Sequence, residues 1–178
     1  IGWRAAALIP IRKDGGSLLP RPGWDPSYDW QGFIPFEEMP FLYNPDKGYI
    51  ATANNKIVDD DYPYYISNQW AEPSRIERIE EWLNSKEKLT VEDMKIFQND
   101  WLSPFARVVV PIISQWLWQD FNVNTRTYIN ILNESDYIDD KESAAVLIFH
   151  TVLDELLNNI YEDEMAMIDD KAFEALVH

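Results

Sequence analysis

The feature that most constrains the fold of this chain is an abrupt change in composition near residue 70. All six glycines and eight of the eleven prolines lie before Trp70, among short apolar runs such as 5–9 and 49–53. Proline and glycine interrupt regular structure, so this part is expected to form loops and short strands. Its many Trp and Tyr rings follow no regular period, and we expect them to pack against another part of a larger protein.

From Ser74 onward, the spacing of apolar residues becomes helical. Ser74 to Glu77 and Thr90 to Asp93 both have the form of a capping box, in which a hydroxyl residue precedes an acidic residue by three positions. Two amphipathic helices are therefore expected. Their apolar faces carry Ile76, Ile79 and Leu83 in the first, and Met94, Phe97, Trp101 and Leu102 in the second.

The remaining segments are predicted from prolines and polar runs. Pro104 and Pro111 should break or restart a helix at a kink or joint, and residues 112–121 should continue as a buried, Trp-rich segment. Residues 122–141 are expected to be a polar joint with turns. The most convincing long helix spans 143–161, and a short last helix is expected over 169–177.

These patterns predict a mainly α fold with some β structure (α+β). The expected division is a loop- and strand-rich segment at 1–72 and a helical subdomain at 73–178. The chain opens on Ile1, with no initiator Met or signal sequence before it. We therefore expect an internal piece of a longer protein.

Charge excludes some classes of function. The formal net charge is -16 and the pI is near 4.3, so binding to the phosphates of a nucleic acid is disfavoured. The part after Trp70 contributes 9 basic and 22 acidic residues. A solvated acidic face explains this excess, and a non-catalytic interaction module with an acidic helical surface is the alternative function. There is no cysteine, and no apolar run is long enough to predict a membrane span.

Several short sequence words occur in a characteristic order in the first part. They are Pro10–Arg12, Leu19–Pro20, Pro22–Gly23, Asp29–Pro40, Tyr43–Pro45, Gly48–Asn55, Asp61–Pro63, Trp70 and Arg75–Ile76. Together they resemble the central β-chain segment of the penicillin acylase family of N-terminal-nucleophile hydrolases. The resemblance covers about the first 80 residues well, and the later helices only by general character.

The resemblance implies an amide hydrolase with the layered αββα fold of these enzymes. They attack the amide with a Ser at the start of the autoprocessed β chain, whose own α-amine is the general base. Ile1 cannot take this role, and Ser17 and Ser67 have no adjacent amine. His150 and His178 belong to no recognisable triad pattern. The chain alone should be inactive and should work with the remainder of the acylase α and β chains.

Two site residues follow from the resemblance. Asn54 aligns with the side-chain amide that helps to form the oxyanion hole, and Asn55 is the candidate if the register is off by one. A structural interpretation also applies, in which both asparagines bond to local backbone. Arg75 aligns with an arginine that supports the polar network of the active site, but an exposed arginine in a first helical turn is also common.

The resemblance also concerns cofactors, substrate and localisation. Several family members hold a structural calcium through a Pro carbonyl and an Asp soon after the Tyr-Pro word. Here the position of that Asp falls near Ile66, so no cofactor or metal is expected in this chain, and a structural calcium stays open for the parent enzyme. The run 59–61 is acidic but lacks the pattern of a calcium loop. Substrates would be N-acylated small molecules such as β-lactam antibiotics or acyl-homoserine lactones. Family members are usually periplasmic or secreted.

One aromatic series has two interpretations. Packing in a core or between domains is favoured over a platform for carbohydrate or lipid. The series comprises Trp24, Tyr28, Trp30, Phe33 and Phe36.

Overall fold

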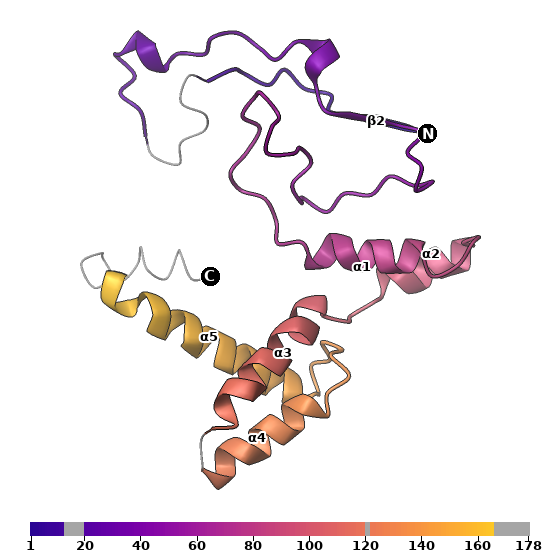
Figure 1. Cartoon of the computed structure of the whole chain (residues 1–178), viewed down its shortest axis with the longest axis vertical. Helices are drawn as coiled ribbons and strands as arrows, with labels where there is room; N and C mark the ends of the chain where they lie inside the picture. The colour runs from indigo at the N-terminus through magenta and orange to yellow at the C-terminus, as the bar shows by residue number, and fades with distance from the viewer. Residues whose placement is uncertain (13–19, 120–121, 166–178) are drawn as a thin grey trace. The chain divides into compact units, whose positions relative to one another are not determined.

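The computed structural model describes residues 1–12, 20–119 and 122–165. The chain forms two compact units, Ile1–Leu89 and Thr90–His178 (Figure 1). The change from loops to helices comes at Ser74, but the first unit extends to Leu89 and therefore includes the first helix. The predicted α+β class, with a loop-rich first part and a helical second part, is confirmed.

A small antiparallel sheet organises the start of the first unit. Strand β1 (Gly2–Arg4) pairs with β2 (Phe41–Tyr43), with Trp3 opposite Leu42. The expected strands at 5–9 and 49–53 do not form. At the end of 5–9 an isolated bridge pairs Pro10 with Phe33. Its hydrogen bonds come from the neighbouring residues: the Ile34 N–H donates to the Ile9 carbonyl and the Ile11 N–H to the Gly32 carbonyl, both at 2.9 Å.

Two short 3-10 turns lie between the strands. They are η1 (Pro26–Tyr28) and η2 (Phe36–Glu38). The buried apolar residues of this unit are few: Ile34, Met39 and Ala53 are 5%, 2% and 5% exposed. The first unit therefore has only a small core of its own among the described residues.

Helix α1 (Ser74–Leu83) closes the first unit. The capping box predicted at Ser74 and Glu77 is wrong, because Ser74 is the first residue of the helix and Pro73 is its N-cap. The carboxylate of Glu72 accepts hydrogen bonds from the backbone N–H of Ser74, at 2.9 Å, and from its hydroxyl. The carboxylate of Glu72 thus satisfies the Ser74 N–H, which the predicted capping box would have paired with Glu77.

Helix α2 (Val91–Gln98) opens the second unit. Its predicted capping box is confirmed: the Thr90 hydroxyl accepts from the Asp93 N–H at 3.2 Å, and the Asp93 carboxylate accepts from the Thr90 N–H at 2.8 Å. The helix is shorter than expected, because the N–H of its C-cap residue Asn99 turns back to Ile96. Trp101 and Leu102 therefore lie outside the helix.

Helices α3 (Pro104–Leu117), α4 (Val123–Asn133) and α5 (Ala144–Met165) complete the second unit. Pro104 starts α3 as predicted, but Pro111 lies inside it. The prediction of a buried, Trp-rich segment at 112–121 is wrong, since Trp116 and Trp118 are 63% and 56% exposed.

The polar joint predicted at 122–141 is also wrong. Its first half is helix α4, which Asn122 caps by accepting from the backbone N–H of Asn124. The long helix predicted at 143–161 is confirmed as α5, and 169–177 lies outside the described residues.

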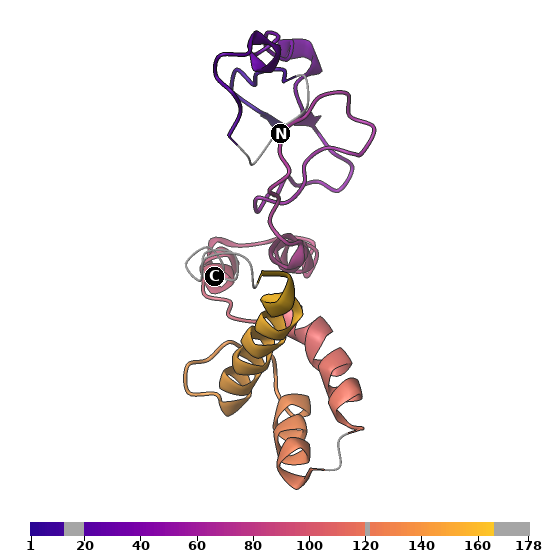
Figure 2. The same cartoon turned by 90° about the vertical axis from the view of Figure 1, so that its left-hand side faces the viewer.

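The core of the second unit lies where these helices meet. Helix α4 packs against both α3 and α5, as the two views in Figures 1 and 2 show. Helix α3 contributes Ala106 and Val110 to the core, α4 contributes Leu132, and α5 contributes Phe149. The rings of Phe105 and Phe149 meet edge to face at 6.2 Å.

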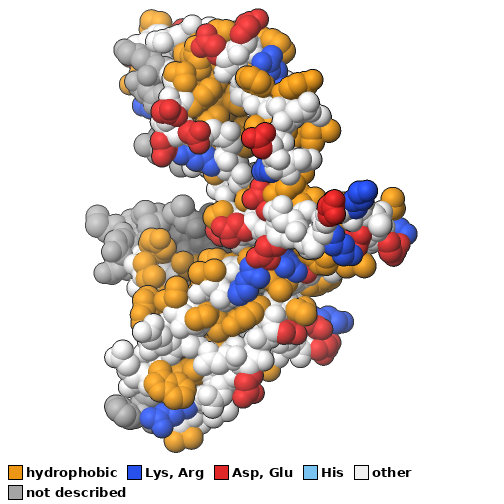
Figure 3. All heavy atoms as spheres, turned by 45° about the vertical axis from the view of Figure 1, so that its right-hand side comes forward, with side chains coloured by type: hydrophobic (Ala, Val, Ile, Leu, Met, Phe, Trp, Pro, Cys, Tyr) orange, Lys and Arg blue, Asp and Glu red, His pale blue; other side chains and the backbone are white. Residues whose placement is uncertain are grey.

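Much apolar surface remains exposed on both units, and Figure 3 shows hydrophobic side chains beside acidic ones on one face. Trp24, Trp30 and Phe36 are 87%, 61% and 63% exposed, so this aromatic series is not part of a core among the described residues. Packing between domains stays a prediction for these rings. In the part of the chain that the structure describes, the helices are too short or too polar to cross a bilayer.

Candidate functional site

Asn54 occupies an unusual backbone conformation in the first unit. Its φ angle is +61°, in the left-handed region that asparagine tolerates better than most residues. Its carbonyl oxygen accepts a hydrogen bond from the backbone N–H of Ala71 at 2.8 Å. The main chain at Asn54 is therefore fixed to the segment that leads into α1.

The side chain of Asn54 is oriented by Arg75. Nη2 of Arg75 donates a hydrogen bond to Oδ1 of Asn54 at 3.0 Å. Arginine has only donors, so the amide must present its oxygen to Arg75, and the reversed orientation would oppose two N–H groups. The amide nitrogen of Asn54 consequently faces away from Arg75 and keeps its N–H groups for another acceptor.

Asn55 is held differently. Its Oδ1 accepts from the backbone N–H of Ala53 at 2.9 Å, and its Nδ2 donates to the carbonyl of Lys56 at 3.0 Å. Both ends of this amide therefore bond to local backbone, as asparagine often does in turns. The two candidates therefore differ: the amide nitrogen of Asn55 bonds to local backbone, whereas that of Asn54 keeps its N–H groups available.

Arg75 lies in the first turn of α1, where the helix dipole opposes a cation. Within the described residues, the structure gives its guanidinium a hydrogen bond to Asn54 but no ion pair with a carboxylate. A full positive charge therefore remains beside the amide oxygen. It polarises the amide and strengthens the N–H groups at its other end as donors.

Two supporting residues were missed from the sequence. Ala71 acts through its backbone N–H, which no side-chain motif reveals. Glu72 binds the N–H of Ser74, the first residue of α1, which lies one residue before Arg75. An acid two positions before a helix start was the signal for Glu72, but the Ser74 pattern masked it.

Two cavities differ in their capacity. One, of about 260 Å³, lies in the first unit, and its lining includes Trp3, Lys47, Asn55, Ile76 and Glu80. Asn54 does not line it. The other, in the second unit, holds about 20 Å³, room for roughly one water molecule.

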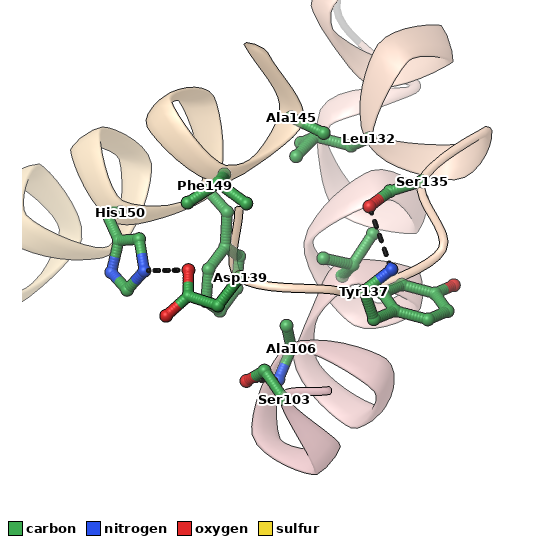
Figure 4. A pocket seen from close by; sticks show the side chains of 11 residues that line it. Ser103, Ala106, Leu132, Ser135, Tyr137, Asp139, Ala145, Phe149 and His150 are labelled. Atoms are coloured by element: carbon green, nitrogen blue, oxygen red, sulfur yellow. Dashed lines mark hydrogen bonds and ion pairs between the residues drawn. The ribbon is translucent and has the colours of Figure 1, made fainter. Parts of the chain in front are cut away.

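Figure 4 shows the small cavity, with His150 and Asp139 beside it. Nε2 of His150 lies 3.2 Å from Oδ1 of Asp139. The nearby Ser135 hydroxyl accepts from the backbone N–H of Tyr137, so this group has a structural partner. Ser67 likewise accepts from the backbone N–H of Gln69. Ser17 and His178 lie outside the described residues.

The acidic run at 59–61 is exposed. Lys56 pairs with Asp60, and this contact lowers the pKa of the Asp60 carboxyl. In the described residues, no group of three or more His, Asp or Glu side chains comes together to hold a metal ion. The described part of the chain therefore offers no cluster of carboxylates of the kind that calcium prefers.

The segment after this run is tied to η2. The Tyr62 hydroxyl donates to the backbone carbonyl of Glu38 at 2.8 Å, and the Tyr64 hydroxyl donates to the Glu38 carboxylate at 2.5 Å. Burial, then the Glu38 charge, raises the pKa of Tyr62, and the hydrogen bond to Glu38 raises that of Tyr64.

Comparisons with known proteins agree with each other. The penicillin amidase family matches residues 1–178. The chain is 32% identical to acyl-homoserine lactone acylase QuiP from Pseudomonas syringae pv. tomato, over 99% of this chain and 23% of that protein. It is 40% identical to penicillin acylase 2 proenzyme from Pseudomonas sp. strain SE83, over 58% of this chain and 13% of that protein.

The fold comparison extends the similarity to a solved structure. The chain resembles the thermostable penicillin G acylase from Alcaligenes faecalis with a TM-score of 0.72 and 22% sequence identity, over 96% of this chain and 32% of that one. The 178 residues thus span about a quarter to a third of the relatives that they match end to end. Because the family model matches residues 1–178, this chain belongs to the penicillin amidase family.

Proposed function

We propose that this chain is part of an amidohydrolase that cleaves the amide of N-acylated small molecules. Its relatives are named as acylases of acyl-homoserine lactones and penicillins, and these two groups define the substrate class that we propose. The nucleophilic Ser and its α-amine would come from the parent polypeptide outside these 178 residues. The parent would act in the periplasm or outside the cell, as the resemblance to the penicillin acylase family implies.

The single observation that carries the proposal is the orientation of the Asn54 amide. When the nucleophile adds to the substrate carbonyl, the carbonyl oxygen gains a negative charge. A neutral N–H donor that is already fixed in place stabilises this oxyanion without reorganising. Asn54 offers such a donor, because Arg75 binds the oxygen of its amide at 3.0 Å and Ala71 holds its backbone at 2.8 Å.

The proposed reaction has two stages. The Ser hydroxyl forms a bond to the carbonyl carbon while its proton passes to the α-amine. The tetrahedral intermediate, held by Asn54, then collapses and releases the amine with that proton. Water hydrolyses the acyl-enzyme through a second tetrahedral intermediate that the same donor stabilises. Arg75 touches no reacting atom in this scheme and is a positioning residue.

The test replaces the amide donor of Asn54 with a carboxylate of the same shape. Asn54→Asp in the full-length parent keeps the left-handed conformation and the contact with Arg75, but it puts an acceptor where the donor was. We expect kcat for acyl p-nitroanilides to fall about 100- to 1000-fold. Mass spectrometry monitors autoprocessing as a separate readout.

Asn55→Asp is the matched control, because it makes the same chemical change at the next residue. It keeps the acceptor for the Ala53 N–H, so its kcat should stay within a fewfold of wild type. Equal losses in both variants would contradict the role of Asn54. A processed parent with no amidase activity on any acyl substrate would overturn the enzymatic proposal. The 178-residue chain alone should show no turnover.

A further inference from the structure

Arg4 ends strand β1, opposite Phe41 in the sheet. Its guanidinium carbon lies 4.2 Å from the ring centroid of Phe36 and 4.9 Å from that of Phe41. Contacts of this kind hold the flat cation against the aromatic faces. The side chain is half-buried, so two rings restrict its position at the edge of the sheet.

The hydrogen-bonding edge of this guanidinium has no partner among the described residues. Glu37 and Glu38 follow Phe36 directly in η2, yet neither forms an ion pair with Arg4. The carboxylate of Glu38 accepts from the Tyr64 hydroxyl instead. Arg78, in contrast, combines stacking on Trp82 with an ion pair to Glu81 at 2.7 Å.

The geometry favours one class of ligand. Cation–ring contacts do not use the hydrogen-bond donors of a guanidinium on a carboxylate or carbonyl, so its N–H groups stay available. Two parallel N–H groups match the two oxygens of a carboxylate. Because the rings already restrict the side chain, binding costs less conformational entropy than it would for a free arginine. The apolar rings also keep water from one side of the cation, which strengthens an ion pair.

The surroundings indicate where the carboxylate comes from. Phe36 and Phe41 are 63% and 57% exposed, so the arginine lies in an apolar surface that nothing in the described residues covers. This chain spans 23% of one relative and 32% of another, so both are several times its length. We propose that an Asp or Glu side chain from the parent polypeptide outside these 178 residues binds Arg4 and docks that part onto this sheet. This inference rests on the proposed function only in assuming a longer parent.

The test compares Arg4→Lys and Arg4→Gln in the full-length parent. Lysine keeps the charge and the attraction to the rings but cannot form the two-pronged contact. If the carboxylate binds the fork, Arg4→Lys should lower Tm almost as much as Arg4→Gln, by about 2 °C or more. If Arg4 only stacks on the rings, Arg4→Lys should stay near wild type, and that result would overturn the proposal.

Arg21→Gln is the control, because Arg21 contacts a single ring, Tyr28, at 5.0 Å. Its Tm should equal that of wild type. Neutralising each Asp and Glu outside the chain in turn should identify one variant whose loss of Tm is not additive with Arg4→Gln. If sodium benzoate instead raises the Tm of wild type but not of Arg4→Gln, the ligand is a small molecule and the docking proposal is wrong. These measurements of Tm need no turnover, so they test the docking proposal even if the parent shows no amidase activity.

Discussion

Arg75 fixes which end of the Asn54 amide is available, because its Nη2 donates to Oδ1 of Asn54 at 3.0 Å. The two residues lie 21 positions apart and are brought together where the segment 50–55 meets the start of α1. The backbone contact from Ala71 to Asn54 reinforces the same meeting point. Two independent hydrogen bonds therefore locate one side-chain donor.

Arg75→Gln in the full-length parent should lower kcat more than it changes KM. The substitution removes the charge that orients and polarises the Asn54 amide, and hydrogen bonds to charged groups contribute about 1.5 to 3 kcal/mol. We expect kcat to fall roughly 10- to 100-fold. In the background of Asn54→Asp the same change should have little further effect, because the donor is already absent. Fully additive losses would show that Arg75 acts independently of Asn54.

Glu38→Gln should make Tyr64 ionise at lower pH. In the folded protein the hydrogen bond to Glu38 raises the pKa of Tyr64, so the fold favours the protonated phenol. The stability that this hydrogen bond contributes is complete below the unfolded-state tyrosine pKa of about 10. It is lost as pH rises through the higher folded-state pKa of Tyr64. Tyrosinate absorbance against pH measures the change, and Glu37→Gln is the control. Identical curves for Glu38→Gln and wild type would exclude this contact.

Leu132→Ala should destabilise the helical unit strongly. Leu132 is 2% exposed and packs among Ala106, Val110 and Phe149, so truncation leaves a cavity. The expected loss is about 2 to 5 kcal/mol, against about 0.5 to 1.5 kcal/mol for Ile129→Val at a position that is 0% exposed. Urea denaturation, monitored by hydrogen exchange in α3 and α4, measures the loss of stability in both variants. Equal losses would argue against close packing at Leu132.

Thr90→Ala should destabilise the start of α2. The change removes the acceptor for the Asp93 N–H in the capping box, at a cost of about 1 kcal/mol. Thr90→Ser keeps the hydroxyl and should remain close to wild type. Hydrogen exchange of the first-turn amides of α2 reports the effect directly. Faster exchange in both variants would mean that the methyl group, rather than the hydroxyl, secures this helix end.

Elements that depend on local sequence were predictable. Pro104 at a helix start, the capping box at Thr90 and the long helix α5 all follow from short-range patterns, and the structure contains each of them. One of the errors has a clear physical cause in tertiary packing. Helix α4 forms in a segment that looked like a polar joint, because buried Ile129 and Leu132 anchor it against its neighbours. Packing of this kind overrides local composition.

The candidate site shows the same division. The resemblance indicated Asn54 and Arg75 as separate residues, but their hydrogen bond depends on a left-handed backbone and on the position of α1. The resemblance already favoured Asn54 over Asn55, and the hydrogen bonds of the two amides add a structural reason for that choice. Ala71 contributes only main-chain atoms, so its role could not be read from any side-chain pattern. The roles of Asn54 and Arg75 in catalysis stay predictions.

The positive φ angle of Asn54 narrows what this position accepts. Glycine, asparagine and aspartate adopt such a backbone most readily, whereas only asparagine and glutamine offer a neutral amide donor. Asparagine alone satisfies both demands. A single-residue library at position 54, selected for turnover, should therefore return the original amino acid, and selection for folding alone should also return glycine and aspartate.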